Sequence, residues 1–265
     1  MLITSRDNSL LRQARAVRDG KVDDLIYIEG LRLCEEALNS RLSIRAVIFS
    51  EEIAQKDKAS QVIASLERVA DRSGTVSEKL LQSISYTKTP QGIVVLATRP
   101  DANRQRLTAA QSVDPLLVVL HRINNPVNVG AILRSAEAAG ATGAIATVNT
   151  SDPFSPKSLR GAMGSAFRLP LWIGPDFPEV INWCQGAGIS TVCATATADT
   201  TYTDVDWKAA TALILGPEST GFTADELTAA SQVVKIPMQG EVESLNVSVA
   251  AGILLYEAAR QRRTG

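Results

Sequence analysis

Three short polar clusters in the second half of the sequence carry the side chains best suited to chemistry. They belong to the segments 124–134, 215–222 and 236–248, and in each the polar cluster follows an apolar run typical of a buried strand. Open α/β sheets bind their ligands at the carboxyl ends of parallel strands. We therefore expect the three clusters to converge on one ligand site.

The first cluster reads Asn-Asn-Pro-Val-Asn-Val-Gly-Ala-Ile-Leu-Arg. Pro126 fixes a backbone torsion, and Asn128 can cap the helix that begins about there. Capping does not explain Arg134, which lies on an otherwise small and apolar helix face. Because an arginine is rarely buried without a partner, Arg134 either reaches solvent or faces a polar site.

The second and third clusters leave similar alternatives open. Glu218 follows Gly216 and Pro217 at the end of a strand, where it either caps the helix starting near Thr223 or faces a ligand. Ser244 could be the N-cap of the last helix. Asn246, one position inside a helix that starts at about Leu245, is less expected there because asparagine is a poor residue for a helix interior.

The composition excludes several kinds of active site. His121 is the only histidine, so a histidine-based triad or a metal centre with several histidines is excluded. Cys34, Cys184 and Cys193 are odd in number and lack a Cys-x-x-Cys spacing, which supports neither a disulfide framework nor a zinc site. A dinucleotide-binding fold needs Gly-x-Gly-x-x-Gly after its first strand, whereas only Gly130 stands at that turn.

In order and spacing, the three clusters resemble the signature motifs of the SpoU (TrmH-type) RNA 2′-O-ribose methyltransferases of the SPOUT superfamily. The resemblance covers residues 116–262. It implies an enzyme that needs no metal and whose catalytic site contains Arg134, Asn128, Glu218, Ser244 and Asn246. It also implies that S-adenosylmethionine is held mostly by backbone groups of Leu215, Gly216, Ile236, Met238, Leu245 and Asn246.

Strands and helices alternate through the second half, which predicts an α/β domain with a mostly parallel sheet and helices on both faces. Strands are expected near residues 116–121, 144–148, 169–173, 189–194, 212–215 and 233–236. The family resemblance adds a deep trefoil knot, which periodicity cannot reveal. We expect this methyltransferase domain to span residues 115–265, after a polar linker at residues 99–114.

The first third of the chain also alternates helix and strand, with a helix capped by Asn8 and ended by Gly20. We expect a small α/β domain at residues 1–98. This domain, which ends in Pro90-Gln91-Gly92-Ile93, resembles the RNA substrate-binding domain of the ribosomal RNA enzymes, which has the fold of a small ribosomal protein (L30e-like).

The charge distribution predicts where RNA binds. Residues 1–112 hold 17 Lys and Arg against 14 Asp and Glu, whereas the rest holds 10 against 14. Arg12, Arg15 and Arg18 share one face of the first predicted helix. Solvated helix faces commonly carry such charges, so an RNA surface and a plain solvent face both remain open. By resemblance, Lys157, Arg160 and Arg168 also approach RNA phosphates.

These patterns together predict a cytoplasmic enzyme, since no window approaches the ~18 apolar residues of a membrane span. Its expected substrate is structured RNA, with 23S rRNA favoured over tRNA. The alternatives are a non-catalytic RNA-binding or ribosome-assembly protein of the same fold, and an antibiotic-resistance enzyme that methylates the ribosome. A homodimer through the C-terminal domain is also expected, because the last helix has more apolar residues than it needs to pack against its own domain on one side, and a partner subunit would bury the others. These apolar residues are Leu245, Val249, Ile253, Leu254 and Tyr256.

Overall fold

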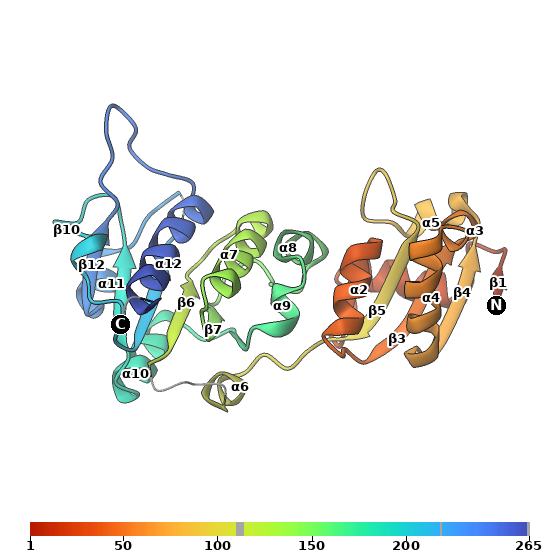
Figure 1. Ribbon diagram of the computed structural model, residues 1–265, viewed down its shortest axis with the longest axis horizontal. Coiled ribbons are helices and arrows are strands. Elements are labelled where there is room, and N and C mark those ends of the chain that lie inside the picture. The colour runs from red at the N-terminus through yellow and green to blue at the C-terminus, as the bar shows by residue number, and fades with distance from the viewer. Residues whose placement is uncertain (110–113, 218, 264–265) are drawn as a thin grey trace. The chain divides into compact units, whose positions relative to one another are not determined.

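The computed structural model describes residues 1–109, 114–217 and 219–263. The chain divides into two compact units (Figure 1). The first comprises residues 1–100 together with 154–168, and the second comprises residues 101–153 and 169 onward. Within the described residues, no helix is both long and apolar enough to cross a membrane.

The first unit contains a five-stranded sheet in the order β1-β4-β3-β5-β2. Its strands are β1 (Leu2–Ile3), β2 (Leu25–Glu29), β3 (Ile44–Ser50), β4 (Arg72–Val76) and β5 (Ile93–Thr98). β1, β4 and β3 run parallel, whereas β5 is antiparallel to both β3 and β2. Its helices are α1 (Ser9–Arg18), α2 (Leu31–Asn39), α3 (Glu51–Ala54), α4 (Asp57–Val69), α5 (Glu78–Ile84), α8 (Pro156–Ala162) and α9 (Ser165–Arg168).

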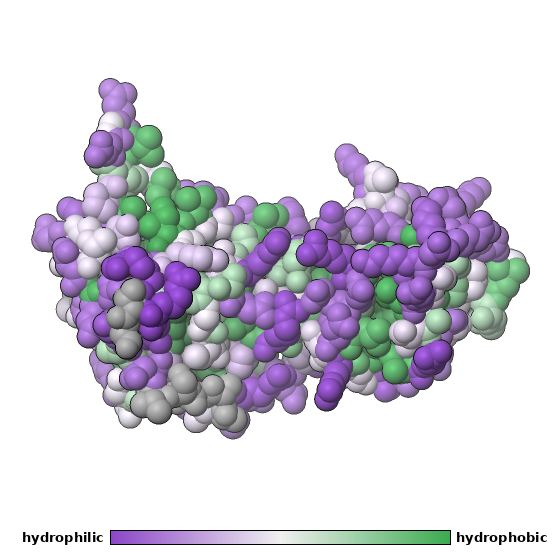
Figure 2. Space-filling model, in the orientation of Figure 1, coloured by the Kyte–Doolittle hydropathy of each residue, from purple (hydrophilic) through white to green (hydrophobic). Residues whose placement is uncertain are grey.

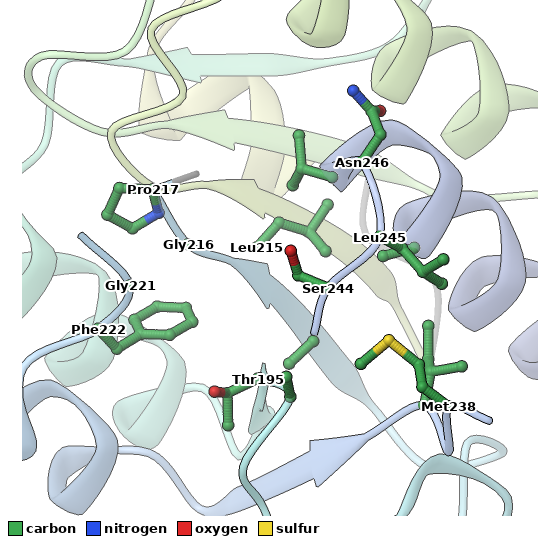
Figure 3. Close-up of a pocket in the computed structure, with 15 residues that line it drawn as sticks. Thr195, Leu215, Gly216, Pro217, Gly221, Phe222, Met238, Ser244, Leu245 and Asn246 are labelled. Atoms are coloured by element: carbon green, nitrogen blue, oxygen red, sulfur yellow. The ribbon is translucent and has the colours of Figure 1, made fainter. Parts of the chain in front are cut away.

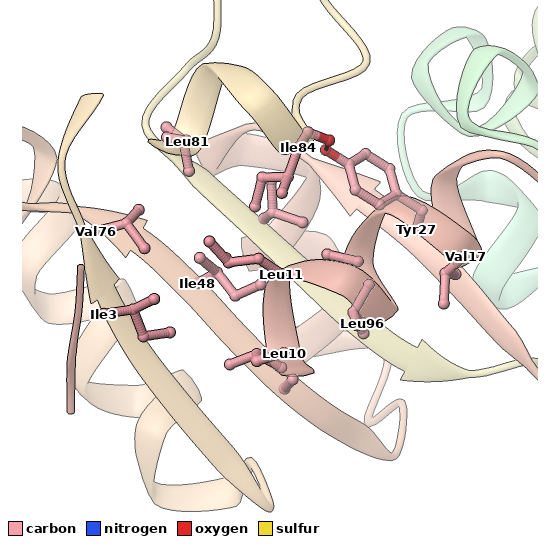
Figure 4. Packing of buried hydrophobic residues seen from close by; sticks show 13 residues of the cluster. Ile3, Leu10, Leu11, Val17, Tyr27, Ile48, Val76, Leu81, Ile84 and Leu96 are labelled. Carbon is pink, nitrogen blue, oxygen red and sulfur yellow. Dashed lines mark hydrogen bonds between the residues drawn. The ribbon is translucent and has the colours of Figure 1, made fainter. Parts of the chain in front are cut away.

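A core of apolar side chains joins α1, α5 and the sheet of this unit (Figure 4). Helix α1 begins where the sequence predicts, because Asn8 accepts a hydrogen bond from the Leu10 N–H at 2.9 Å. Tyr27 is fully buried among these side chains and donates its hydroxyl proton to the Ile84 carbonyl at 2.9 Å. The buried hydroxyl is thereby satisfied, and it fixes the end of α5.

The sequence of strand β4 does not have the pattern of a strand. Its sequence, Arg-Ser-Gly-Thr-Val, lacks the apolar run that marks the other strands. The backbone of Gly74 lies against Ile3, where a Cβ would come within 2.5 Å of the isoleucine side chain. The glycine that hides the strand in the sequence is therefore the residue that lets β1 and the core approach it.

The second unit contains a seven-stranded sheet in the order β10-β12-β9-β11-β6-β7-β8. Every pairing in it is parallel, which confirms the predicted fold class. Its strands are β6 (Leu116–Leu120), β7 (Gly143–Ala146), β8 (Leu171–Ile173), β9 (Ser190–Ala194), β10 (Thr200–Thr201), β11 (Thr211–Leu215) and β12 (Gln232–Lys235). Its helices are α6 (Arg104–Ala109), α7 (Pro126–Ala138), α10 (Phe177–Gly186), η1 (Tyr202–Asp204), α11 (Ala224–Ala229) and α12 (Val247–Arg263). The knot remains a prediction.

Both faces of this sheet are covered. Leu117 and Val119 pack in one apolar cluster with α10 residues such as Val180. Successive strand residues point to opposite faces, and Val118 and Leu120 are also fully buried. A strand buried on both faces reads as the continuous apolar run seen at residues 116–120.

The predicted linker at residues 99–114 contains a helix, α6. Its residue Leu107 is buried and packs against the backbone of Gly143, where a larger residue than glycine would clash. One apolar residue in a polar stretch gives no periodic signal, which is why the helix is absent from the sequence prediction. Residues 110–113 lie outside the described residues.

Candidate active site

A cavity of about 430 Å³ lies at the carboxyl ends of β9, β11 and β12, beside the segment that leads into α12 (Figure 3). Its lining residues are Ala194, Thr195, Ala196, Leu215, Gly216, Pro217, Gly221, Phe222, Ile236, Met238, Ser244, Leu245, Asn246, Val247 and Ala250. All six residues that the sequence suggests for a cofactor are among them, and so is Ser244. Glu218 lies outside the described residues.

The walls of this cavity are mostly apolar. The Phe222 ring lies on one side, and Met238 and Leu245 lie on the other (Figure 3). A Cβ at Gly216 would come within 2.6 Å of the Phe222 ring, so only glycine permits this packing. A few polar groups, such as Thr195 and Ser244, complete a wall of the kind that small-molecule sites use.

Helix α7 begins differently from the sequence prediction. Asn125, not Asn128, is its N-cap, since the Asn125 side chain accepts from the Val127 N–H at 3.0 Å and Pro126 takes the first turn. Asn128 is a buried polar residue, only 5% exposed, inside the first turn. The Asn246 amide nitrogen donates to its side-chain oxygen at 3.4 Å. Asn128 is thus joined to the cavity through Asn246.

The start of helix α12 also departs from the prediction for Ser244. The Asn246 side-chain oxygen accepts from the Ser248 N–H at 2.9 Å and from the Ser248 hydroxyl, which makes Asn246 the capping residue. Ser244 lies two residues earlier and lines the cavity. An asparagine that looks misplaced inside a helix is therefore placed at its end, where asparagine is favoured.

Arg134 is exposed on α7 and does not line the cavity. Within the described residues it has no hydrogen-bond or ion-pair partner. The sequence leaves open whether this side chain reaches solvent or faces a polar site. In the structure of a single chain it faces solvent.

A buried polar network next to the cavity was not predicted. His121, directly after β6, lies with Nε2 3.0 Å from Glu226 and Nδ1 3.1 Å from the Thr147 hydroxyl. Arg122 donates from Nη2 to both carboxylate oxygens of Glu226 at 2.9 Å each. The Phe222 ring stacks on the His121 ring, with centroids 6.0 Å apart and planes 5° apart. The network therefore supports the aromatic wall of the cavity.

The same contacts set the ionisation of this network. Burial lowers the pKa of His121, and this effect outweighs the attraction of Glu226. Burial alone would raise the pKa of Glu226, but hydrogen bonds from the Thr223 N–H and His121, together with the Arg122 charge, lower it overall. A neutral His121 donates from Nε2 to the carboxylate and accepts from Thr147 at Nδ1, so each ring nitrogen has one partner.

Glu226 also belongs to a capping box with Thr223 at the start of α11. The sequence Thr-Ala-Asp-Glu carries the signal for that box. Its link to His121, 105 residues earlier, has no sequence signal. Thr195 could have been predicted because it directly follows β9, whose carboxyl end lies at the ligand edge of the sheet, and Phe222 because it belongs to the second polar cluster.

The arginines of α1 differ in availability for RNA. Arg12 is exposed. Arg18 donates to Asp19 at 2.8 Å and to the Ser85 carbonyl beyond α5 at 3.2 Å, and its side chain is 21% exposed. Arg15 is only partly exposed. The structure thus gives Arg18 contacts that stabilise the fold of the first unit.

The second basic group lies on α8 and α9. Lys157 and Arg160 are exposed on α8. Arg168 pairs with Glu36 of α2. This pair attaches α9 to α2 within the first unit.

The cavity and the parallel sheet together define an α/β enzyme domain with its site at the strand ends. Comparison of the sequence with known families identifies the class of enzyme. Residues 115–256 match the model of the SpoU rRNA Methylase family, and residues 11–95 match that of the MRM3-like substrate binding domain. The chain belongs to the SpoU rRNA methylase family. This membership confirms the family resemblance of the three clusters and the prediction of an RNA methyltransferase.

Named and solved relatives match 90% or more of the chain. An uncharacterized tRNA/rRNA methyltransferase of Synechocystis is 32% identical over 98% of this chain and 94% of its own length. The 23S rRNA (uridine(2479)-2′-O)-methyltransferase of Streptomyces viridochromogenes is 29% identical over 90% of this chain and 83% of its own length. The AdoMet-bound rRNA methyltransferase of Sinorhizobium meliloti has a TM-score of 0.85 at 28% identity, covering 98% of this chain and 97% of that one.

Proposed function

We propose that this protein transfers a methyl group from S-adenosylmethionine to a ribose 2′-oxygen of structured RNA, with 23S rRNA as the substrate. The observation that carries the proposal is the convergence of Leu215, Gly216, Ile236, Met238, Leu245 and Asn246 on one cavity. The relative from Streptomyces viridochromogenes is named for this reaction on 23S rRNA, and the solved relative from Sinorhizobium meliloti binds AdoMet.

The cavity has the properties that S-adenosylmethionine requires. Its apolar walls, such as Phe222 and Met238, suit an adenine ring, and the Gly216 backbone, which lines the cavity, suits the polar edges of the ligand. When bound, S-adenosylmethionine supplies a methyl group on a sulfonium sulfur. Ser244 and Asn246 then lie where they can orient a ribose, and such positioning supplies much of the acceleration in a displacement.

The charge of Arg134 stabilises the oxyanion that forms at the 2′-oxygen. A guanidinium has a pKa above about 12, so it is a poor general base but a lasting positive charge. The proton goes to a substrate phosphate or to water. Asn128, held by Asn246, contributes to the same site, and we assign Glu218 to it by family motif alone.

We further propose a homodimer whose active site is shared. Arg134 does not line the cavity of its own chain, so a second copy must supply it if it acts there. Figure 2 shows apolar residues gathered where α12 begins. Val249 and Tyr256 on α12 are each 51% exposed, and Leu245 is 37% exposed, whereas Leu254 is fully buried. A two-fold interface is self-complementary, so one such patch per subunit suffices.

A mixing experiment tests the shared site. Arg134→Ala and Gly216→Ala proteins are each expected to be inactive, the second because the added Cβ meets Phe222. Co-refolded at equal amounts, they form heterodimers with one intact site, which should restore about a quarter of wild-type activity. A fully active monomer in sedimentation would contradict the dimer.

The first unit is proposed to hold the RNA. Residues 1–98 act as the substrate-binding domain and residues 115–265 as the methyltransferase domain, with residues 99–114 between them. Arg12 and Lys157 are exposed and available to phosphates. With a ribosomal substrate, we propose the cytoplasm as its location.

Mapping 2′-O-methyl groups in rRNA from cells with and without the gene tests the activity. One ribose should lose its methyl group without the gene, and purified protein should bind S-adenosylmethionine. An unchanged map together with defective ribosome assembly would instead favour a non-catalytic assembly protein. A methyl group that appears only in resistant cells, with altered antibiotic susceptibility, would favour a resistance enzyme.

A further inference from the structure

The first unit contains a second cavity, about 220 Å³ in volume, which shares no lining residue with the cavity at the strand ends of the second unit. Glu29, Arg32, Thr87, Gln91, Arg160 and Met163 line it, and all of them belong to this unit. We propose that one unpaired nucleotide of the RNA substrate binds in this cavity and sets which RNA is recognised. The inference rests on the proposed function, since it specifies how the RNA is selected.

Hydrogen bonds to Glu29 fix one part of the cavity lining. Glu29 is only 8% exposed, although it is a carboxylate. It accepts hydrogen bonds from the Tyr86 N–H at 2.8 Å, the Thr87 N–H at 3.3 Å and the Thr87 hydroxyl at 2.6 Å. Charge-assisted bonds to a buried carboxylate are among the stronger hydrogen bonds in proteins. Glu29 therefore holds the loop after α5 in one place over the cavity.

The position of Gln91 is also fixed by the backbone. Gly30 has a φ of 103°, and a Cβ there would come within 2.5 Å of the Gln91 Oε1 atom. The glutamine side chain therefore lies directly over the Gly30 backbone, in a space that only glycine leaves open. This places an amide, with one acceptor and two donors, at the mouth of the cavity.

Arg160 of α8 and Met163, directly after that helix, also line the cavity. The adjoining helix α9 is attached to α2 by the Arg168–Glu36 pair, and Gly164 lets these two side chains approach the backbone. Arg32 and Arg160 thus bring two guanidinium groups to a cavity that contains one carboxylate. In the described parts of the chain, neither guanidinium nor the Gln91 amide has a hydrogen-bond or ion-pair partner.

This set of groups fits a nucleotide. Guanidinium groups bind the phosphates, and an amide beside a hydroxyl can read the hydrogen-bonding edge of a base. Met163 offers a polarisable surface against the face of a base. Tyr86, 45% exposed on the same loop, offers an aromatic ring for a neighbouring base. Sequence-specific proteins recognise RNA mostly through such unstacked bases.

Three variants test the proposal, with 23S rRNA from cells lacking the gene as the probe. Gln91→Ala removes the amide without changing charge, and Arg160→Ala removes one charge at the cavity. Arg68→Ala is the matched control, because Arg68 is an exposed arginine of α4 in the same unit that does not line the cavity. Affinity for the RNA, its salt dependence, kcat and KM are measured for each.

Gln91→Ala should raise the Kd and KM for RNA about tenfold with an unchanged salt slope, because a neutral contact is lost. Arg160→Ala should weaken binding and reduce the salt slope by about one. kcat and the affinity for S-adenosylmethionine should stay at wild-type values, since neither residue lines the cofactor cavity and each contact contributes uniform binding. Arg68→Ala should resemble wild type.

The proposal is overturned if Gln91→Ala and Arg160→Ala both match Arg68→Ala in Kd for RNA. A lower kcat at unchanged KM would also overturn it. If the wild-type protein transfers no methyl group to any RNA, the proposed function fails. The Kd comparison still decides the nucleotide site in that case, because it does not depend on turnover.

Discussion

The side-chain amide nitrogen of Asn246 lies 3.4 Å from the amide oxygen of Asn128, although 118 residues separate the two positions. The contact joins the start of α12 to the first turn of α7. Asn246 also caps α12 through its oxygen, so one side chain has two separable tasks. Its oxygen organises the helix, and its nitrogen positions a residue of the proposed active site.

The first prediction separates these two tasks. Asn246→Asp keeps the oxygen that caps α12 but loses the donor to Asn128, so stability should stay close to wild type while methyl transfer falls at least about tenfold. Asn246→Ala should lose both, with a further cost of about 1 kcal/mol in the free energy of unfolding. Thermal unfolding and turnover of both variants check this. Full activity in Asn246→Asp would show that the Asn128 contact is not needed.

The second prediction concerns Arg134. Arg134→Ala should reduce kcat by about 10²–10³, the usual loss when a group that stabilises an oxyanion is removed. Its Kd for S-adenosylmethionine should not change, because Arg134 does not line the cavity. Arg134→Lys should recover part of the activity because it keeps a positive charge. Calorimetric titration and single-turnover kinetics measure the two quantities, and near-wild-type turnover in Arg134→Ala would refute the role.

The third prediction is a loss of stability in mild acid. Burial holds the pKa of His121 below its ordinary value of 6.5, so the unfolded chain binds more protons than the folded one as the pH falls below about 6.5. Stability should then decrease by at most about 1.4 kcal/mol per pH unit. The lowered pKa of Glu226 adds a further loss only below about 4.5.

Unfolding midpoints between pH 7.5 and 5.5 isolate the contribution of His121. His121→Asn removes the titrating ring, so its midpoint should depend less on pH than that of wild type. It should also bind S-adenosylmethionine more weakly, because Phe222 loses the ring on which it stacks. Equal pH dependence in the two proteins would rule out His121 as the titrating group.

The fourth prediction concerns the anchor of the last helix. Arg262 donates to the carbonyls of Asp114 at 2.6 Å, Trp207 at 2.7 Å and Ala209 at 2.7 Å. Arg262→Ala leaves these acceptors without their partner and should cost about 1–3 kcal/mol of stability. Arg260→Ala is the control, since Arg260 is exposed on the same helix and pairs with Glu257. Equal denaturation midpoints for the two variants would contradict the anchor.

The sequence predicts the sheet of the second unit well because its strands are continuous apolar runs, such as residues 116–120. It predicts the cavity residues for a different reason, since the family motifs name them. Strand β4 and helix α6 escape prediction because Gly74 and Leu107 act through tertiary packing, and neither produces a periodic pattern.

Within the site, local rules failed where two candidates stood close together. Asn125 and Asn128 can both cap α7, and only the structure shows that Pro126 follows the true cap. The sequence favours a helix that already contains Asn246, whereas α12 begins at Val247, directly after this residue. The bond between His121 and Glu226 spans 105 residues and could not be read from either position alone.

The most direct test of the central claim is methyl transfer in vitro. Protein, labelled S-adenosylmethionine and 23S rRNA from cells lacking the gene are incubated, and the RNA is then hydrolysed in alkali. Because a 2′-O-methyl group blocks cleavage at its own nucleotide, we predict one labelled, alkali-resistant dinucleotide, which is absent with Arg134→Ala. Label in mononucleotides would place the methyl on a base, and RNA without label despite bound S-adenosylmethionine would contradict the proposed activity.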